Sequence, residues 1–497
     1  MEFARHIAET ASQMKEPFQS EDENRWLILI VTTLGAFMTP FDTSAVNLAI
    51  PSIGLDLGGE LLLLSWIPVA YLLALTTFLI VSGRLGDVKG RKSLYIIGTL
   101  IFTFSSTLSG LSNSLYQLIT ARVGQGIGAS MMSGNSVAFA TSAFLPSQRG
   151  KAVGIITAAT YTGLSMGPVL GGLLISEFGW RSIFYLNVPL GLITAVLCHF
   201  KTYERFEIRR EASLDVLGAL SLIISLSSIL ASVSLSQIAM IPRQYVLGLM
   251  AIGVLSLLFF VFVEKRFARQ PLVDVRLFTE NRVFAFSNLT AFLHYLASYG
   301  IGFLMSLYLQ LILRLDPYQA GLVMLSQPFL MAAVSPFSGH LSDRIEPRLL
   351  SSMGLAIMTA AILILSGVSD ETTTNMIVLI LIVLGFGYGL FSSPNTSAVM
   401  GSVPKESLGL GSGMLATMRF LGQSFSLALV TFVLTSSVSA DILIVGKEQL
   451  NVPVGEFLFG VRAALRVCAV IGATAVIVSA ARGKMSHVDS SRIPSLS

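Results

Sequence analysis

The sequence has little charge for its length. Asp, Glu, Lys and Arg make up 12% of its 497 residues, whereas 53% are hydrophobic, and the mean hydropathy is +0.75. A soluble domain of this size needs far more charge on its surface. The composition therefore excludes a soluble globular protein and predicts a polytopic membrane protein built from α-helices.

Cysteine is also scarce, and several catalytic motifs are missing. Cys198 and Cys468 both fall within apolar runs, so we expect neither a disulfide framework nor a metal site. The sequence has no HExxH motif, no cluster of Cys and His, and no GxxxxGK[ST] phosphate-binding loop. These absences argue against a membrane enzyme and against an ATP-driven pump, and we expect no cofactor.

Apolar runs long enough to cross a bilayer recur along the whole chain. They predict fourteen transmembrane helices, and an even count places both termini on the same side of the membrane. Most of the 32 Lys and Arg residues lie in the loops and tails of that side, so we expect this side to face the cytoplasm. The membrane is expected to be the cell membrane. The predicted helices lie near residues 26–49, 64–82, 94–111, 115–144, 153–176, 183–200, 214–236, 245–263, 283–313, 320–340, 349–368, 376–400, 408–437 and 457–481.

The remaining charge follows from this topology. The net charge of +4 reflects basic loops that face anionic lipid, so we expect lipid contacts and no nucleic-acid partner. Residues 1–25 are polar and acidic. We therefore expect no cleavable signal peptide, and the first helix itself should target the membrane.

The most charged connection is the loop of residues 83–92, GRLGDVKGRK, in which Asp87 is the only acid. A related pattern recurs far along the chain at Gly339, Asp343 and Arg344, again between two apolar runs. This recurrence predicts that the chain contains two copies of one unit, as many transporters do. The alternative is that each loop is an ordinary solvated turn.

Asp42 is an acid within the first predicted helix, about seven residues or ~10 Å from its outer end. An ionised carboxylate is costly there unless it is paired or hydrated. A conformational change that alters its burial or its partner would make it bind or release a proton. The alternative is an acid that reaches the outer surface or caps a neighbouring helix.

Arg122 is the expected partner of Asp42. It lies about seven residues, or ~10 Å, below the outer end of the fourth helix, at a depth similar to that of Asp42. Gln125 follows one turn further along the same helix. The alternative is an ion pair that only holds the first and fourth helices together, and this is compatible with a role in proton coupling.

Glycines recur every fourth residue in the fifth predicted helix, at Gly163, Gly167 and Gly171, and Pro168 should bend its middle. Such a seam is often a plain packing face. Together with the bend, it favours a contact between two bundles that move against each other.

Several of these residues resemble the motifs of the major facilitator superfamily, and specifically of its fourteen-helix drug:proton antiporters. Arg122 and Gln125 match the superfamily's signature in helix 4, and Asp42 and Asn47 resemble the branch motif in helix 1. The run from Trp180 to Gly191 resembles a further branch motif. The residues that match the loop and antiporter signatures are Gly83, Leu85, Asp87, Gly90, Arg91 and Lys92, and Gly163, Gly167, Pro168, Gly171 and Gly172.

The resemblance implies two six-helix bundles that rock about a central cavity, with two extra helices inserted as a hairpin. The expected parts are a cytoplasmic tail (1–25), the first bundle (26–200), a linker with the extra helices (201–282), the second bundle (283–482) and a second cytoplasmic tail (483–497). In the family the loop acid, here Asp87, holds the cytoplasmic side closed. We expect it to face the start of the helix near Ser407 to Gly411.

The second bundle offers fewer distinctive residues. His294 and Arg419 are expected near the middle of the membrane, and His294 could titrate near neutral pH or be an ordinary structural histidine. The aromatic residues of the same helix offer a surface either to a flat substrate or to neighbouring helices. The polar candidates for lining the cavity are Asn47, Gln125, His294, Tyr308, Gln310, Asn395, Arg419 and Gln423.

These features predict an antiporter that exports lipophilic or amphipathic molecules in exchange for protons, with the proton gradient as its energy source. Asp42 is the only acid identified well inside a predicted helix, against Arg122 and Arg419, so neutral, weakly cationic or anionic substrates fit better than dicationic drugs. We expect a monomer. The alternatives are an exporter dedicated to one metabolite, such as a siderophore, an antibiotic or an amino acid, and a membrane sensor or scaffold without transport.

Overall fold

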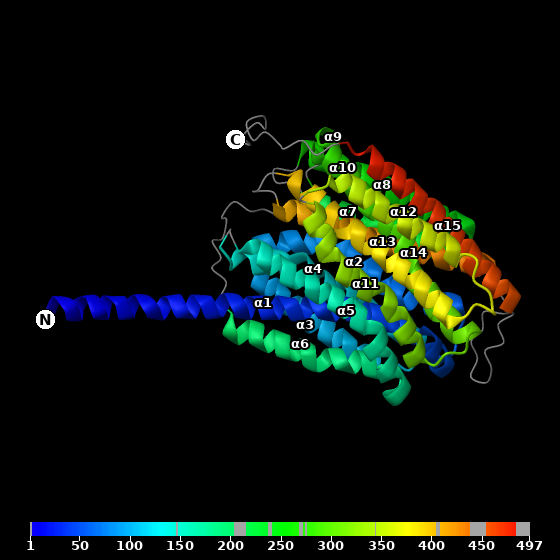
Figure 1. The fold of residues 1–497 in the computed structure, drawn as a ribbon, viewed down its shortest axis with the longest axis horizontal. Helices are drawn as coiled ribbons and strands as arrows, with labels where there is room; N and C mark the ends of the chain where they lie inside the picture. Colours follow the sequence, from blue (N-terminus) through cyan, green and yellow to red (C-terminus); the bar gives the residue numbers. More distant parts are fainter. Residues whose placement is uncertain are drawn as a thin grey trace.

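The structure is a computed structural model that describes residues 2–145, 148–202, 215–236, 241–267, 272–273, 276–342, 344–403, 408–437 and 454–483. Side chains are described from Asn24 onward in the first helix and from Leu410 onward in the helix that begins at Leu408. Within these residues the chain consists almost entirely of long helices that lie side by side (Figure 1).

The helices of the first half are α1 (Glu2–Leu57), α2 (Leu61–Lys89), α3 (Arg91–Gly110), α4 (Leu115–Ser142), α5 (Arg149–Phe178) and α6 (Arg181–Lys201). Two more, α7 (Val216–Leu235) and α8 (Arg243–Arg266), precede the short α9 (Arg276–Glu280). The second half contains α10 (Arg282–Leu307) with the π-helical turn η1 (Tyr308–Ile312), α11 (Pro317–Ser342), α12 (Pro347–Leu365), α13 (Thr374–Gly401), α14 (Leu408–Ser436) and α15 (Val454–Ala481).

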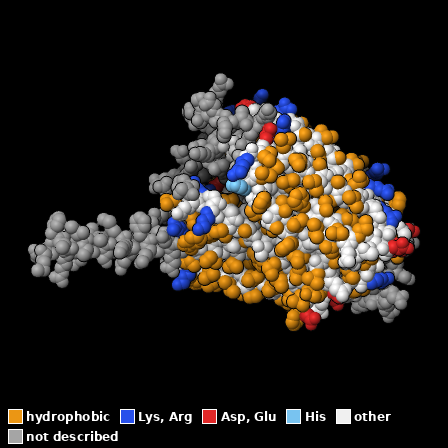
Figure 2. Space-filling model, in the orientation of Figure 1, with side chains coloured by type: hydrophobic (Ala, Val, Ile, Leu, Met, Phe, Trp, Pro, Cys, Tyr) orange, Lys and Arg blue, Asp and Glu red, His pale blue; other side chains and the backbone are white. Residues whose placement is uncertain are grey.

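Thirteen helices in the described part of the chain are long and apolar enough to cross a membrane. The long helix that falls outside this set is α4, whose 28 residues include Arg122 and Gln125 and many small residues. It lies among the other long helices (Figure 1). With α4 included, the arrangement agrees with the predicted fourteen transmembrane helices. On the face shown in Figure 2, hydrophobic side chains cover the middle and charged side chains gather near the two ends.

The two halves repeat one arrangement of helices. In the first half α1 packs against α5, α2 and α3 pack against α4, and α3 packs against α6. In the second half α10 packs against α14, α11 and α12 pack against α13, and α12 packs against α15. The order of these pairings is the same, which confirms the two six-helix bundles.

Close contacts at glycine show the same repeat at the level of atoms. A Cβ atom at Gly163 of α5 would collide with the carbonyl oxygen of Phe37 in α1, and one at Gly422 of α14 would collide with that of Phe292 in α10. Glycine is required at both positions because the two backbones meet there.

The extra helices α7 and α8 form the inserted hairpin. They pack against each other, and α7 also contacts α2 and α14, one helix from each bundle. Buried hydrophobic residues of the hairpin join this contact, with Leu222 and Phe260 in one cluster with Val399 and Met414. The hairpin therefore packs on the periphery of the protein, where the two bundles meet.

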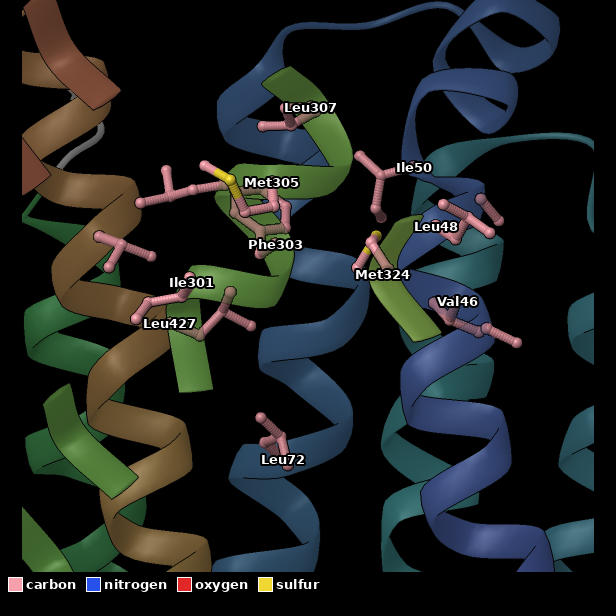
Figure 3. Packing of buried hydrophobic residues seen from close by; sticks show 14 of the residues in the cluster. Val46, Leu48, Ile50, Leu72, Ile301, Phe303, Met305, Leu307, Met324 and Leu427 are labelled. Carbon is pink, nitrogen blue, oxygen red and sulfur yellow. The ribbon is translucent and has the colours of Figure 1, made fainter. Parts of the chain in front are cut away.

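The outer halves of the two bundles are in direct contact. The Ser306 hydroxyl of α10 donates a hydrogen bond to the Asn47 carbonyl oxygen (2.9 Å), and Gln310 Nε2 of η1 donates one to the Leu48 carbonyl oxygen (3.0 Å). Ile50 of α1 lies beside Met324 of α11 and toward the buried side chains of α10, and all of them belong to one buried cluster (Figure 3). The two bundles are thus closed against each other at this end, which is the end expected from the sequence to lie outside the cell.

Candidate functional site

The site is built around a buried ion pair between α1 and α4. Arg122 Nη1 lies 2.5 Å from Asp42 Oδ2, and both side chains are fully buried. The two residues thus meet as their depths in the sequence predicted. The alternative position for Asp42, at the outer surface or at the end of a neighbouring helix, is wrong.

The second carboxylate oxygen of Asp42 accepts two more hydrogen bonds. Gln125 Nε2 of α4 and Asn187 Nδ2 of α6 each lie 2.9 Å from Asp42 Oδ1. Gln125 Nε2 also donates to the Ser106 hydroxyl of α3 (2.8 Å). The acid therefore has polar partners on both oxygens, from α4 and α6, so its buried acceptor atoms are satisfied.

Besides Asp42, Arg122 interacts with groups that carry no full charge. Its Nη1 donates to Gln125 Oε1 (2.6 Å), its Nε donates to the Ile67 carbonyl oxygen (3.3 Å), and its guanidinium lies 4.2 Å from the centre of the Tyr71 ring. Its Nη2 has no hydrogen-bond partner among the described residues. Neutralising Asp42 would leave Arg122 a buried cation without a counter-ion, so the two groups are strongly coupled.

The ion pair lies close to the other bundle. Tyr299 of α10 interacts electrostatically with both Asp42 and Arg122, and its hydroxyl faces the side chain of Asn47 in α1. Asn47 is buried, and its Oδ1 has no hydrogen-bond partner among the described residues. Separation of α1 from α10 would thus change the surroundings of Asp42, which links the pair to the movement of the bundles.

The charged loop is shorter than expected. The helix α2 continues to Lys89 and α3 begins at Arg91, so the turn consists of Gly90 alone, with φ at 99° where glycine is favoured. The Arg91 guanidinium bonds the Asp87 carboxylate (2.8 Å) and the Ala138 carbonyl oxygen of α4 (3.1 Å).

The neighbouring residues tie this turn to other helices. Lys92 Nζ donates to the carbonyl oxygens of His199 (3.1 Å) and Thr202 (2.5 Å) at the end of α6. The partner that the structure shows for Asp87 is Arg91, and the expected contact with the start of α14 stays a prediction because Ser407 lies outside the described residues.

The loop of Gly339, Asp343 and Arg344 resembles the first loop in having a glycine that lies close to another helix. A Cβ at Gly83 would approach the carbonyl oxygen of Gly134 in α4, and one at Gly339 would collide with the Ser393 side chain in α13. Arg344 is exposed. Asp343 lies outside the described residues, so its role stays a prediction.

The glycine seam of α5 faces a different helix from the one expected. Gly163, Gly167 and Gly171 all pack against α1 of the same bundle. The prediction that this seam faces the other bundle is therefore wrong. The contact with the other bundle is made by Gly172, which meets Pro317 at the start of α11, and by the Pro168 carbonyl oxygen, which meets Gly321.

The predicted polar residues of the second bundle lie in separate places. The Tyr308 hydroxyl bonds the Ser369 carbonyl oxygen (2.6 Å), and Gln310 belongs to the closed outer contact. Asn395 Oδ1 accepts a hydrogen bond from Arg482 (3.1 Å), and Gln423 is half-buried in α14. His294 lies at the middle of α10, and Arg419 and Gln423 both lie near the middle of α14, so these three are the strongest cavity candidates of the second bundle.

Two buried polar residues of the structure, Asn187 and Arg482, were not predicted from the sequence as buried site residues. Asn187 belongs to the motif-like run from Trp180 to Gly191, which begins α6, but its contact with Asp42 depends on how α6 packs. Arg482 is 1% exposed and bonds Ser287 and Ser351 as well as Asn395. Burial lowers the pKa of Arg482 to about 10. Its burial was not predicted because it directly follows the last apolar run.

Comparisons with known proteins agree with this arrangement. The family model described as Major Facilitator Superfamily matches residues 32–427 and 288–488. Riboflavin transporter RibZ of Clostridioides difficile is 32% identical over 413 residues, 82% of this chain and 88% of the relative. Multidrug resistance protein Stp of Mycobacterium tuberculosis is 33% identical over 84% of this chain and 77% of the relative.

A further relative is an exporter by name. Cephamycin export protein CmcT of Amycolatopsis lactamdurans is 30% identical over 83% of this chain and 86% of the relative. Among solved structures, a D-xylose–proton symporter superposes with a TM-score of 0.62 at 12% identity, over 92% of this chain and 97% of the other. At this identity, the structural likeness supports the fold alone.

Proposed function

This chain belongs to the Major Facilitator Superfamily and is a multi-pass membrane transporter, and we propose that it is a proton-coupled antiporter that exports lipophilic or amphipathic small molecules. It would work in the cell membrane with both termini in the cytoplasm, and the proton gradient would supply the energy. The observation that carries this proposal is the buried pair of Asp42 and Arg122 beside the junction of the two bundles.

The pair supplies a way to couple protons to movement. In the closed conformation Asp42 is fully buried, so water does not reach it. When the outer contact between α1 and α10 opens, water reaches the pair and Asp42 exchanges its proton with the outside. Protonation weakens its attraction to Arg122, and this changes the relative stability of the two conformations.

Asp87 and the turn at Gly90 have the second role in the proposed mechanism. The Arg91 side chain joins the end of α2, the start of α3 and the backbone of α4. In the proposed mechanism this connection keeps the cytoplasmic ends of these three helices together as one unit while the first bundle moves against the second.

A half-open apolar hollow on the surface of the second bundle is compatible with lipid as well as with a lipophilic substrate. It has a volume of about 270 Å³ and is lined by Phe278, Ala285, Phe286, Leu289 and Met418, near the cytoplasmic ends of α10 and α14. Apolar walls favour an apolar ligand. The relatives named as multidrug resistance proteins support the same substrate class.

A dedicated exporter of one metabolite is the second candidate. It is favoured by the relatives named for riboflavin and for cephamycin, each a single class of compound. The two candidates share the coupling mechanism and differ in how many compounds are carried.

Transport by the purified protein in liposomes tests the proposal. A panel of fluorescent lipophilic compounds is offered with and without a pH gradient across the membrane. We expect uphill movement of several compounds that a protonophore abolishes. Movement of a single compound supports the dedicated exporter, uphill movement that the protonophore leaves unchanged contradicts proton coupling, and binding without flux contradicts transport.

A further inference from the structure

His294 in the middle of α10 is a buried polar side chain without a polar partner. It is fully buried, and neither of its ring nitrogens has a hydrogen-bond partner among the described residues. An unsatisfied buried polar group costs about 1–3 kcal/mol. The interpretation of His294 as a satisfied structural histidine therefore does not fit, and a bound molecule would reach its nitrogens once the side chains packed around it separate.

Aromatic rings surround this histidine. The rings of Tyr388 and Phe391 in α13 each lie 4.2 Å from the His294 ring, and that of Tyr295 lies 4.9 Å away, centre to centre. Tyr295 and Tyr388 also pack edge to face at 5.9 Å. Such rings favour another flat ring placed against their faces or edges.

Arg419 of α14 adds a positive charge to this group. It interacts with the Tyr295 hydroxyl, and its guanidinium lies 4.7 Å from the centre of the Phe420 ring. No carboxylate forms a salt bridge with Arg419 within the part of the chain that the structure describes. Arg419 is partly exposed, and a cation within the membrane-spanning part of α14 attracts an anion and repels another cation.

The group also reaches the other bundle. Tyr161 of α5 interacts electrostatically with Tyr295 and Tyr388, and its hydroxyl lies 2.8 Å from that of Ser392 in α13. A molecule bound beside Tyr388 would thus lie where α5 of the first bundle meets the second bundle, and its binding would respond to their relative movement.

We propose that His294, Tyr295, Tyr388 and Arg419 form a substrate subsite for planar aromatic molecules that carry a negatively charged or hydrogen-bonding group at one edge. The aromatic rings bind the flat face, His294 bonds the polar edge, and Arg419 selects against cations. This inference rests on the proposed export function and defines the class of substrate that the function would serve.

The test uses three ligands of one shape and different charge: anthracene-2-carboxylate, anthracene-2-carboxamide and 2-anthracenyltrimethylammonium. Their binding to the full-length protein in lipid nanodiscs is followed by anthracene fluorescence, without a pH gradient. We expect the carboxylate and the amide to bind about tenfold or more tightly than the ammonium compound. Equal or tighter binding of the ammonium compound overturns the proposal.

Two substitutions locate the subsite. Arg419→Gln should remove the preference for the carboxylate over the ammonium compound, whereas Arg466→Gln, at an exposed arginine of α15, should leave it unchanged. His294→Phe keeps an aromatic ring and should weaken binding of the amide about tenfold. The matched control, His199→Phe, changes an exposed histidine at the end of α6.

The outcomes separate this inference from the proposed function. If the protein moves lipophilic compounds against protons but His294→Phe and Arg419→Gln bind all three ligands as the wild type does, the subsite is wrong and the antiporter stands. If the charge preference is found and depends on Arg419 but no compound is moved against protons, the subsite stands and the export function is wrong.

Discussion

Asp42 and Arg122 are both buried, so the free-energy cost of removing one charge depends on whether the other charge is present. Arg122→Gln leaves Asp42 as a buried carboxylate without its counter-ion, which should cost about 3–5 kcal/mol of stability or force the acid to bind a proton. The double variant Asp42→Asn/Arg122→Gln removes both charges. We expect it to melt at a higher temperature than Arg122→Gln alone in detergent, and additive losses would contradict the coupling.

Asp87 has a different environment, because its ion pair with Arg91 is partly exposed to solvent. Such a pair contributes about 0–1 kcal/mol to stability. Asp87→Asn should therefore melt close to the wild type but transport several-fold more slowly, since the turn is no longer fixed to Arg91. Lys89→Gln, at the exposed last residue of α2, is the matched control, and wild-type transport by Asp87→Asn would contradict a role in gating.

At the scale of residues, the sequence predicted contacts that depend on depth and missed those that depend on packing. Asp42 and Arg122 could be matched because helical rise converts residue number into depth. Asn187 and Tyr299 could not be placed beside them, because their contacts depend on how α6 and α10 are rotated. His294 was recognised as polar, but only the packed structure shows that its nitrogens lack partners.

At the scale of elements, α5 fits against α1 through residues without side chains. In Gly163→Ala the new Cβ would meet the Phe37 carbonyl oxygen, so we expect a loss of about 1–3 kcal/mol, seen as a lower melting temperature. Gly154→Ala on the same helix has open space around its new Cβ. It should be neutral or stabilising by up to about 1 kcal/mol, and equal losses in both variants would contradict the close contact.

The helices themselves were predictable from hydropathy, but their ends and faces were not. Residues 83–89 carry many charges and were expected in a loop, yet they continue α2 because one glycine is enough for the turn. The glycine seam predicted close packing correctly but not its partner, since small residues permit approach by any helix. For this reason the sequence predicted that the seam contacts the other bundle, whereas it contacts α1 of its own bundle.

At the scale of the whole molecule, the closed outer contact must open during transport. Leu48→Cys and Gln310→Cys place two thiols on either side of it, in a chain whose buried cysteines are replaced by Cys198→Ser and Cys468→Ala. A short bifunctional thiol reagent should join them and stop transport. Each single-cysteine variant should keep its activity after the same treatment, and full transport by the joined protein would contradict alternating access.

Proton release on substrate binding measures the role of Asp42 most directly. A compound that the wild type moves in liposomes is added to the purified protein in weakly buffered detergent solution, and the pH change is recorded. We predict that the wild type releases protons as it binds the compound, whereas Asp42→Asn binds it and releases none. Proton release by Asp42→Asn equal to that of the wild type would contradict the account.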